Sequence, residues 1–285
     1  MNRSVILVDF LRFNLQHWAG DIFFLGRGLS PLSESHQIEK GYIDFMSNSN
    51  SDINNNFLEP VDFISLYDRF VAANDKKQMQ LIPDLIAQGE IGLDVLMKFL
   101  HQAGNTPKII HGNVYQALLT LEISKVQNFL QTNFPTGILP LQSAQGIDYT
   151  KLQQLLAKQD FLESDRLTMQ KLCELAGDAT VKRKWLYFTE VDSLPVIDLQ
   201  TINNLWLLHS EGKFGFSVQR ELWLAFNQDF IKLWSAIGWK SGNDWTRYPQ
   251  QFTWNLNAPK GHLPLSNQLR GVQVIKAILS HPAWN

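Results

Sequence analysis

The side chains that could carry acid–base, nucleophilic or metal chemistry are scattered along this sequence. The seven histidines do not cluster, and no His-Glu-x-x-His helix, phosphate-binding glycine loop or G-x-S-x-G elbow is present. Glu190 and Asp192 would share one face of an extended segment. No His or Lys follows them to complete an acid–base pair, so we expect both carboxylates to be solvent-exposed. The lack of a catalytic constellation favours a binding role over an enzyme.

Two isolated residues have chemistry of their own. His262 lies in a segment rich in glycine and proline and could ligate the metal of a macrocycle. A lone histidine between Gly and Leu-Pro is more typical of a structural hydrogen-bonding residue. Cys173 is the single cysteine and falls on a leucine-rich helical face, so we expect an inert core thiol, with no internal disulfide.

Aromatic residues concentrate in the C-terminal part of the chain. Eight of the nine tryptophans lie at or after Trp185, and no acidic residue follows Asp244. The basic residues that remain beyond that point are Arg247, Lys260, Arg270 and Lys276. Such a surface suits a flat hydrophobic ligand with anionic edges, although an ordinary tryptophan-rich core would give the same composition.

Composition places the chain among globular proteins. It has 285 residues, 45% hydrophobic and 18% charged, which allows one large domain or two modest ones. The formal net charge of −2 gives no general attraction to nucleic acids or membranes. No run approaches the roughly 18 apolar residues of a membrane-spanning helix.

The elements that would position these residues are helical. From Glu59 onward, Phe63, Leu66 and Phe70 recur at helical spacing, and similar patterns continue as short hairpins, including one longer helix from Val114 to Leu130. We therefore predict an N-terminal helical-repeat-like bundle over residues 57–141. Residues 1–56, an extension followed by an Asn/Ser-rich linker, are predicted to be poorly ordered, and residues 1–45 to be dispensable.

Residues 146–285 are predicted to form a second, all-helical domain with long aromatic loops, so the fold class is all-α. One helix is expected to end at Gly177, an aromatic connection to run from Trp185 to Val191, and Asp198 to cap the next helix. Residues 238–265 are punctuated too often by Gly and Pro for a helix, with a brief strand expected over Phe252–Leu256. Unstructured loops longer than about 12–15 residues are usually functional.

Three ordered motifs resemble those of the genomes-uncoupled-four family, in particular its cyanobacterial members. They are Asp198-Leu-Gln-Thr-Ile-Asn-Asn-Leu-Trp206, His209-Ser-Glu-Gly-Lys-Phe-Gly-Phe-Ser-Val-Gln219 and Ala258-Pro-Lys-Gly-His-Leu-Pro264. The resemblance covers residues 57–285 and leaves residues 1–56 outside. It implies a non-catalytic regulator that binds protoporphyrin IX and magnesium protoporphyrin IX and stimulates magnesium chelatase, through its large porphyrin-binding subunit, in chlorophyll biosynthesis.

The resemblance also implies a binding site in an all-helical cupped hand with an apolar palm. By position, Phe188 and Val191 fall on its first loop, Trp245 and Tyr248 on its long second loop, and Arg270 at the start of the last helix. Two residues depart from the cyanobacterial pattern. Tyr248 stands where Trp is expected and keeps a face for stacking, whereas Gln273 stands where Arg is expected and removes one partner for a propionate. The chain also stops a little early, at Asn285.

Further expectations follow from the same resemblance. The protein should be a monomer in the cyanobacterial cytoplasm or the plastid stroma, with peripheral membrane association left open and no nucleic-acid partner. The alternatives are a haem-binding sensor, which would use His262 as axial ligand, and a helical protein-interaction scaffold. A single-stranded nucleic-acid binder fits less well, because the basic residues are sparse.

Overall fold

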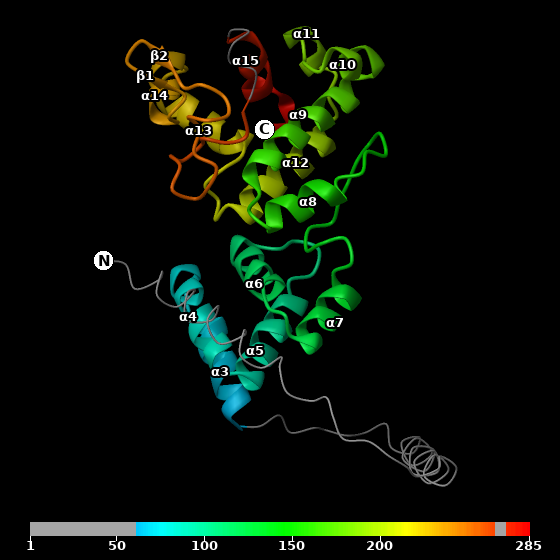
Figure 1. The fold of residues 1–285 in the computed structure, drawn as a ribbon, viewed down its shortest axis with the longest axis vertical. Helices are drawn as coiled ribbons and strands as arrows, with labels where there is room; N and C mark the ends of the chain where they lie inside the picture. The colour runs from blue at the N-terminus through cyan, green and yellow to red at the C-terminus, as the bar shows by residue number, and fades with distance from the viewer. Residues whose placement is uncertain (1–60, 266–271) are drawn as a thin grey trace, which may run out of the picture. The chain divides into compact units, whose positions relative to one another are not determined.

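A computed structural model describes residues 61–265 and 272–285 of the chain (Figure 1). The fold is all-α, as predicted, because helices account for nearly all regular structure in the described residues. The predicted extension over residues 1–56 lies outside the described residues.

The first helices surround one apolar cluster that includes Phe70, Leu96, Val114 and Leu118. The repeating apolar faces read from the sequence supply these buried residues. The helices are α3 Val61–Ala72, α4 Asp75–Ala87, α5 Glu90–His101, α6 Ile109–Leu119 and α7 Ser124–Asn133.

The single helix expected from Val114 to Leu130 is two helices, so that prediction was wrong. Helix α6 ends at Leu119, where the Thr120 hydroxyl donates to the carbonyl oxygen of Ala117 at 2.8 Å. Helix α7 begins at Ser124. The chain turns between them while both helices keep their apolar residues on one cluster, and a local periodicity count cannot detect such a break.

The remaining elements build a second apolar cluster with Trp206, Phe214 and Trp239 fully buried at its centre. The elements around this cluster are α8 Thr150–Ala157, α9 Phe161–Ala176, α10 Asp178–Arg183, α11 Phe188–Val191, α12 Val196–His209, α13 Phe216–Ala225, α14 Phe230–Ala236, β1 Lys240–Ser241, β2 Asp244–Trp245, α15 Gln273–Ser280 and the 3₁₀ turn Pro282–Trp284. Helix α9 is closed by Gly177, as predicted, with φ of +102°.

Two local predictions in this part were wrong. Asp198 does not cap α12 but lies inside it, fully buried, and accepts hydrogen bonds from the Tyr149 hydroxyl and the Ala144 amide. A strand does not form over Phe252–Leu256. Instead β1 and β2 pair antiparallel, Lys240 opposite Trp245, around a turn at Gly242, whose φ is +59°. The dipeptide Gly-Asn at this turn is a hairpin signal that the sequence carried.

Candidate ligand-binding site

The turn between α10 and α11 is held by an arginine that packs over two aromatic rings, Trp185 and Tyr187, which themselves contact each other with centroids 4.4 Å apart. The Arg183 guanidinium lies 4.6 Å from the Trp185 ring centroid and 4.3 Å from that of Tyr187. Its Nη2 donates to both carboxylate oxygens of Glu190, at 2.8 and 2.6 Å, and its Nε donates to the Trp185 carbonyl at 3.1 Å. Glu190 also accepts from the Tyr187 amide at 2.7 Å. The turn is therefore fixed before any ligand arrives.

This arrangement corrects the prediction for Glu190. The carboxylate is about three-quarters buried and paired with Arg183, because the segment is a helical turn and not the extended chain assumed from the sequence. The hydrogen bonds from the Tyr187 amide and from Arg183 lower the pKa of Glu190 below its ordinary value, in spite of desolvation, which acts the other way. Glu190 is thus a structural anion.

Phe188 and Val191 share α11 but have different surroundings. The Phe188 side chain is 49% exposed, whereas Val191 is fully buried in the second apolar cluster. Helix α11 packs against α15 (Figure 1), whose first residue, Gln273, is exposed. Arg270 lies outside the described residues. Phe188 therefore leaves its ring accessible to solvent, while Val191 anchors the helix that carries it in the core.

The second predicted loop presents Trp245 and Tyr248. The half-buried Trp245 ring packs edge-on against Trp234, with ring centroids 4.7 Å apart, and Lys240 Nζ lies 5.6 Å from its centroid. Tyr248 is 41% exposed and packs edge-on against Trp254 at 5.8 Å. Both residues therefore leave aromatic surface accessible at the edge of the core.

Residues 238–265 are mostly irregular but firmly tied to the helices. The buried Gln219 side chain on α13 donates to the carbonyl oxygens of Gly261 and Pro264, at 3.0 and 2.8 Å. Asp165 on α9 accepts from the Leu265 amide at 2.6 Å, and burial raises the pKa of this carboxyl to about 7. These contacts satisfy the backbone of a segment that cannot form regular structure.

His262 is one of the residues that hold this segment. Its Nδ1 lies 2.6 Å from the Ile237 carbonyl oxygen, and its Nε2 accepts from the Thr253 amide at 3.2 Å. Because Nε2 accepts a hydrogen bond, the ring is neutral, and burial lowers the pKa of the imidazole in the same sense. With both ring nitrogens engaged, His262 is not placed to bind a metal. Among the described residues there is also no group of three His, Cys, Asp or Glu that could hold a metal ion.

Cys173 is buried, as predicted, and burial raises the pKa of its thiol to about 11. The thiol stays protonated at neutral pH and is a packing residue.

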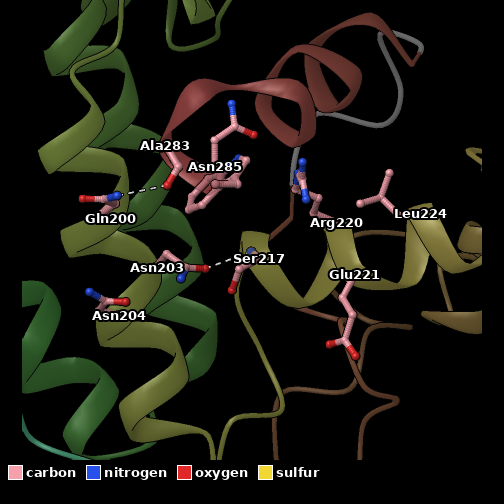
Figure 2. A pocket seen from close by; sticks show the side chains of 10 residues that line it. Gln200, Asn203, Asn204, Ser217, Arg220, Glu221, Leu224, Ala283 and Asn285 are labelled. Carbon is pink, nitrogen blue, oxygen red and sulfur yellow. Dashed lines mark hydrogen bonds between the residues drawn. The ribbon is translucent and has the colours of Figure 1, made fainter.

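A cavity of about 700 Å³ lies elsewhere, between α12, α13 and the 3₁₀ turn (Figure 2). Asn203 accepts a hydrogen bond there from the Ser217 amide, and Gln200 donates to the Ala283 carbonyl oxygen. The lining residues are Gln200, Asn203, Asn204, Ser217, Arg220, Glu221, Leu224, Ala283, Trp284 and Asn285. None of the five predicted site residues that the structure describes lines this cavity, and its many side-chain amides do not suit a flat apolar ring.

The sequence analysis did not single out Arg183 and Arg166, which hold the two aromatic segments. Arg183 alternates with Trp185 and Tyr187, a basic–aromatic spacing that could have been noticed. Arg166 carried no local signal, because its partner Tyr248 is 82 residues away in sequence.

No helix among the described residues has both the length and the apolar character needed to cross a membrane.

Comparison with known proteins links these elements to a family. Residues 142–282 match the family described as GUN4-like, and residues 56–135 match an ARM-like repeat domain at the N-terminus of the same family. A Ycf53-like protein of Synechocystis is 56% identical over 217 residues, which cover 75% of this chain and 92% of the relative.

Two further relatives each match about half of this chain. The chloroplastic tetrapyrrole-binding protein of Arabidopsis thaliana is 42% identical over 142 residues, 47% of this chain and 54% of that protein. The solved structure of GUN4 from Chlamydomonas reinhardtii shares 42% identity, covers 51% of this chain and 93% of that one, and has a TM-score of 0.49. By the two family matches and the Synechocystis relative, this chain belongs to the GUN4 family.

Proposed function

We propose that this chain is a non-catalytic regulator that binds protoporphyrin IX and magnesium protoporphyrin IX. The observation that carries the proposal is the pair of exposed aromatic rings, Phe188 and Tyr248, on two segments that buried hydrogen bonds and an enclosed ion pair hold in place. Family membership supports it, since a relative in Arabidopsis is named a tetrapyrrole-binding protein. Aromatic faces suit the wide apolar face of a macrocycle.

Phe188, Trp245 and Tyr248 would contact the ring in this proposal, with Val191 behind them. Arg270 would pair with a propionate through its guanidinium, and Gln273 would offer only a neutral side chain at the start of α15. A haem-sensing role through His262 is less well supported, because both of its ring nitrogens already have partners.

The test is a titration with deuteroporphyrin, a soluble porphyrin, followed by tryptophan emission. We expect saturable quenching with micromolar or tighter affinity, about −8 kcal/mol or better. A folded sample whose tryptophan emission does not change would remove the proposal.

The regulatory part of the proposal is stimulation of magnesium chelatase through its large porphyrin-binding subunit. This role would place the protein in the cyanobacterial cytoplasm or the plastid stroma, as a monomer that associates with membranes peripherally if at all. Adding the full chain to a reconstituted chelatase should raise the rate of magnesium insertion. If the chain binds porphyrin but leaves that rate unchanged, the regulatory part fails and the binding part stands.

A further inference from the structure

Arg166 connects helix α9 to the aromatic loop at Tyr248. Its Nε donates to the Tyr248 hydroxyl oxygen at 3.3 Å, and its Nη1 lies 2.5 Å from Oε1 of Glu163, three residues earlier on the same helix. The side chains of Arg166 and Glu163 are 49% and 47% exposed. The guanidinium therefore stands at the accessible rim of an aromatic ring, with further N–H groups open to solvent.

We infer that Arg166 is a carboxylate-binding residue of the tetrapyrrole site. Its guanidinium binds one acidic side chain of a macrocycle that stacks on Tyr248. The inference rests on the proposed function and deepens it by naming the group that the site recognises. A ligand that covers the exposed face of Tyr248 brings its edge to the phenol hydroxyl, where Arg166 is already bound. A guanidinium can then form two parallel hydrogen bonds with a ligand carboxylate.

The present partner of Arg166 can be exchanged easily. An exposed ion pair between helix neighbours contributes little, typically about 0.2–1 kcal/mol, because water screens it. A carboxylate held in place by a stacked ring can therefore displace Glu163. Arg183 differs, since its partner Glu190 is about three-quarters buried and also accepts from the Tyr187 amide.

The charges near Arg166 and the contacts that fix its helix also favour it as the carboxylate-binding residue. No acidic residue follows Asp244 in the sequence, so the segment around Tyr248 adds no competing anion. The neighbouring Asp165 is occupied with the Leu265 amide. Arg166 therefore projects from a helix turn that is itself anchored to the loop, which fixes the position of the guanidinium relative to Tyr248.

The experiment compares deuteroporphyrin free acid with its dimethyl ester on the full-length chain, by tryptophan quenching. Arg166→Gln should weaken binding of the acid about three- to tenfold and leave the ester within about twofold, because only the acid offers a carboxylate. Glu163→Gln removes the competing anion and should strengthen binding of the acid about two- to threefold. Arg69→Gln, the same charge change on an exposed residue of α3, is the matched control and should change neither ligand.

The outcomes separate this inference from the proposed function. If the unmodified chain binds both ligands and Arg166→Gln weakens them equally, or not at all, Arg166 only supports the loop and the inference is wrong. An unmodified chain that binds neither ligand removes the proposed function and the inference together. Selective loss for the acid in Arg166→Gln, with selective gain in Glu163→Gln, supports the inference.

Discussion

Phe188 and Val191 lie on the same helical turn, and their burial predicts opposite consequences of truncation. Phe188→Ala removes an exposed ring, so we expect it to lower porphyrin affinity while the free energy of unfolding changes by less than about 0.5 kcal/mol. Val191→Ala leaves a cavity in the core and should cost about 1–3 kcal/mol of stability. Porphyrin titration and urea unfolding of both variants measure the two effects. Equal stability losses would contradict the difference in burial.

Asp165 predicts a pH dependence of stability. Desolvation raises the pKa of its carboxyl from 3.8 to about 7, while the Leu265 amide and the Arg166 charge oppose that shift. The folded chain therefore binds more protons at this site than the unfolded chain between these pH values, and the free energy of unfolding falls as pH rises through that range. Above about pH 7 the carboxyl is ionised in both states and the loss levels off.

Asp165→Asn keeps a carbonyl oxygen for the Leu265 amide but cannot ionise. Its free energy of unfolding relative to the parent should therefore increase from pH 5 to pH 8, by on the order of 1 kcal/mol or more. Urea unfolding of both proteins at the two pH values measures this difference. A difference that does not change with pH would show that the carboxyl titrates alike in both states.

The α10–α11 turn depends on the planar guanidinium of Arg183. Arg183→Lys keeps the charge, but an ammonium group cannot lie flat over the Trp185 and Tyr187 rings while it binds Glu190. We expect a stability loss of about 1–3 kcal/mol and weaker porphyrin binding, because the turn that presents Phe188 loosens. Amide hydrogen exchange at Tyr187, whose N–H binds Glu190, should become faster.

The control for this turn is Lys182→Ala, one residue earlier on α10, where the side chain is exposed. It should leave both the Tyr187 exchange rate and the porphyrin affinity unchanged. Similar effects from both substitutions would mean that the losses are not specific to the guanidinium of Arg183.

At the scale of the whole molecule, the first helices, α3 to α7, contact the second group of helices, α8 to α15. Helix α6 packs closely on α12, since a Cβ at Gly112 would lie 2.3 Å from the Leu208 carbonyl oxygen, and Gln116 donates to the His209 carbonyl oxygen at 3.2 Å. The segment between α7 and α8 lies against α12 where the Gln142 carbonyl oxygen accepts a hydrogen bond from the Thr201 hydroxyl. The proposed site residues, from Phe188 to Gln273, all follow residue 142 in sequence.

We therefore expect a fragment of residues 142–285 to fold and to bind porphyrin as the full chain does. It should melt at a lower temperature, because Leu208 loses the apolar cluster that covers it. Thermal unfolding and the quenching titration test both parts. A folded fragment that has lost the ligand would show that the first helices shape the site.

The sequence by itself determined what short-range patterns control. Apolar spacing predicted an all-α chain, glycine placed the end of α9 at Gly177, and the leucine-rich face around Cys173 indicated a buried thiol. The family resemblance was also readable, because ordered motifs do not depend on coordinates. These features depend on residues within a few positions of one another.

Only the tertiary structure decided which side chains meet and which are buried. Asp165 binds Leu265 across 100 residues, Arg166 reaches Tyr248 across 82, and Gln219 holds Pro264 across 45. The same applies to Asp198, which was expected as a helix cap and proved to be a buried acceptor for Tyr149. Hydrogen bonds between distant segments leave no periodic trace in sequence, because the packing of whole helices brings their partners together.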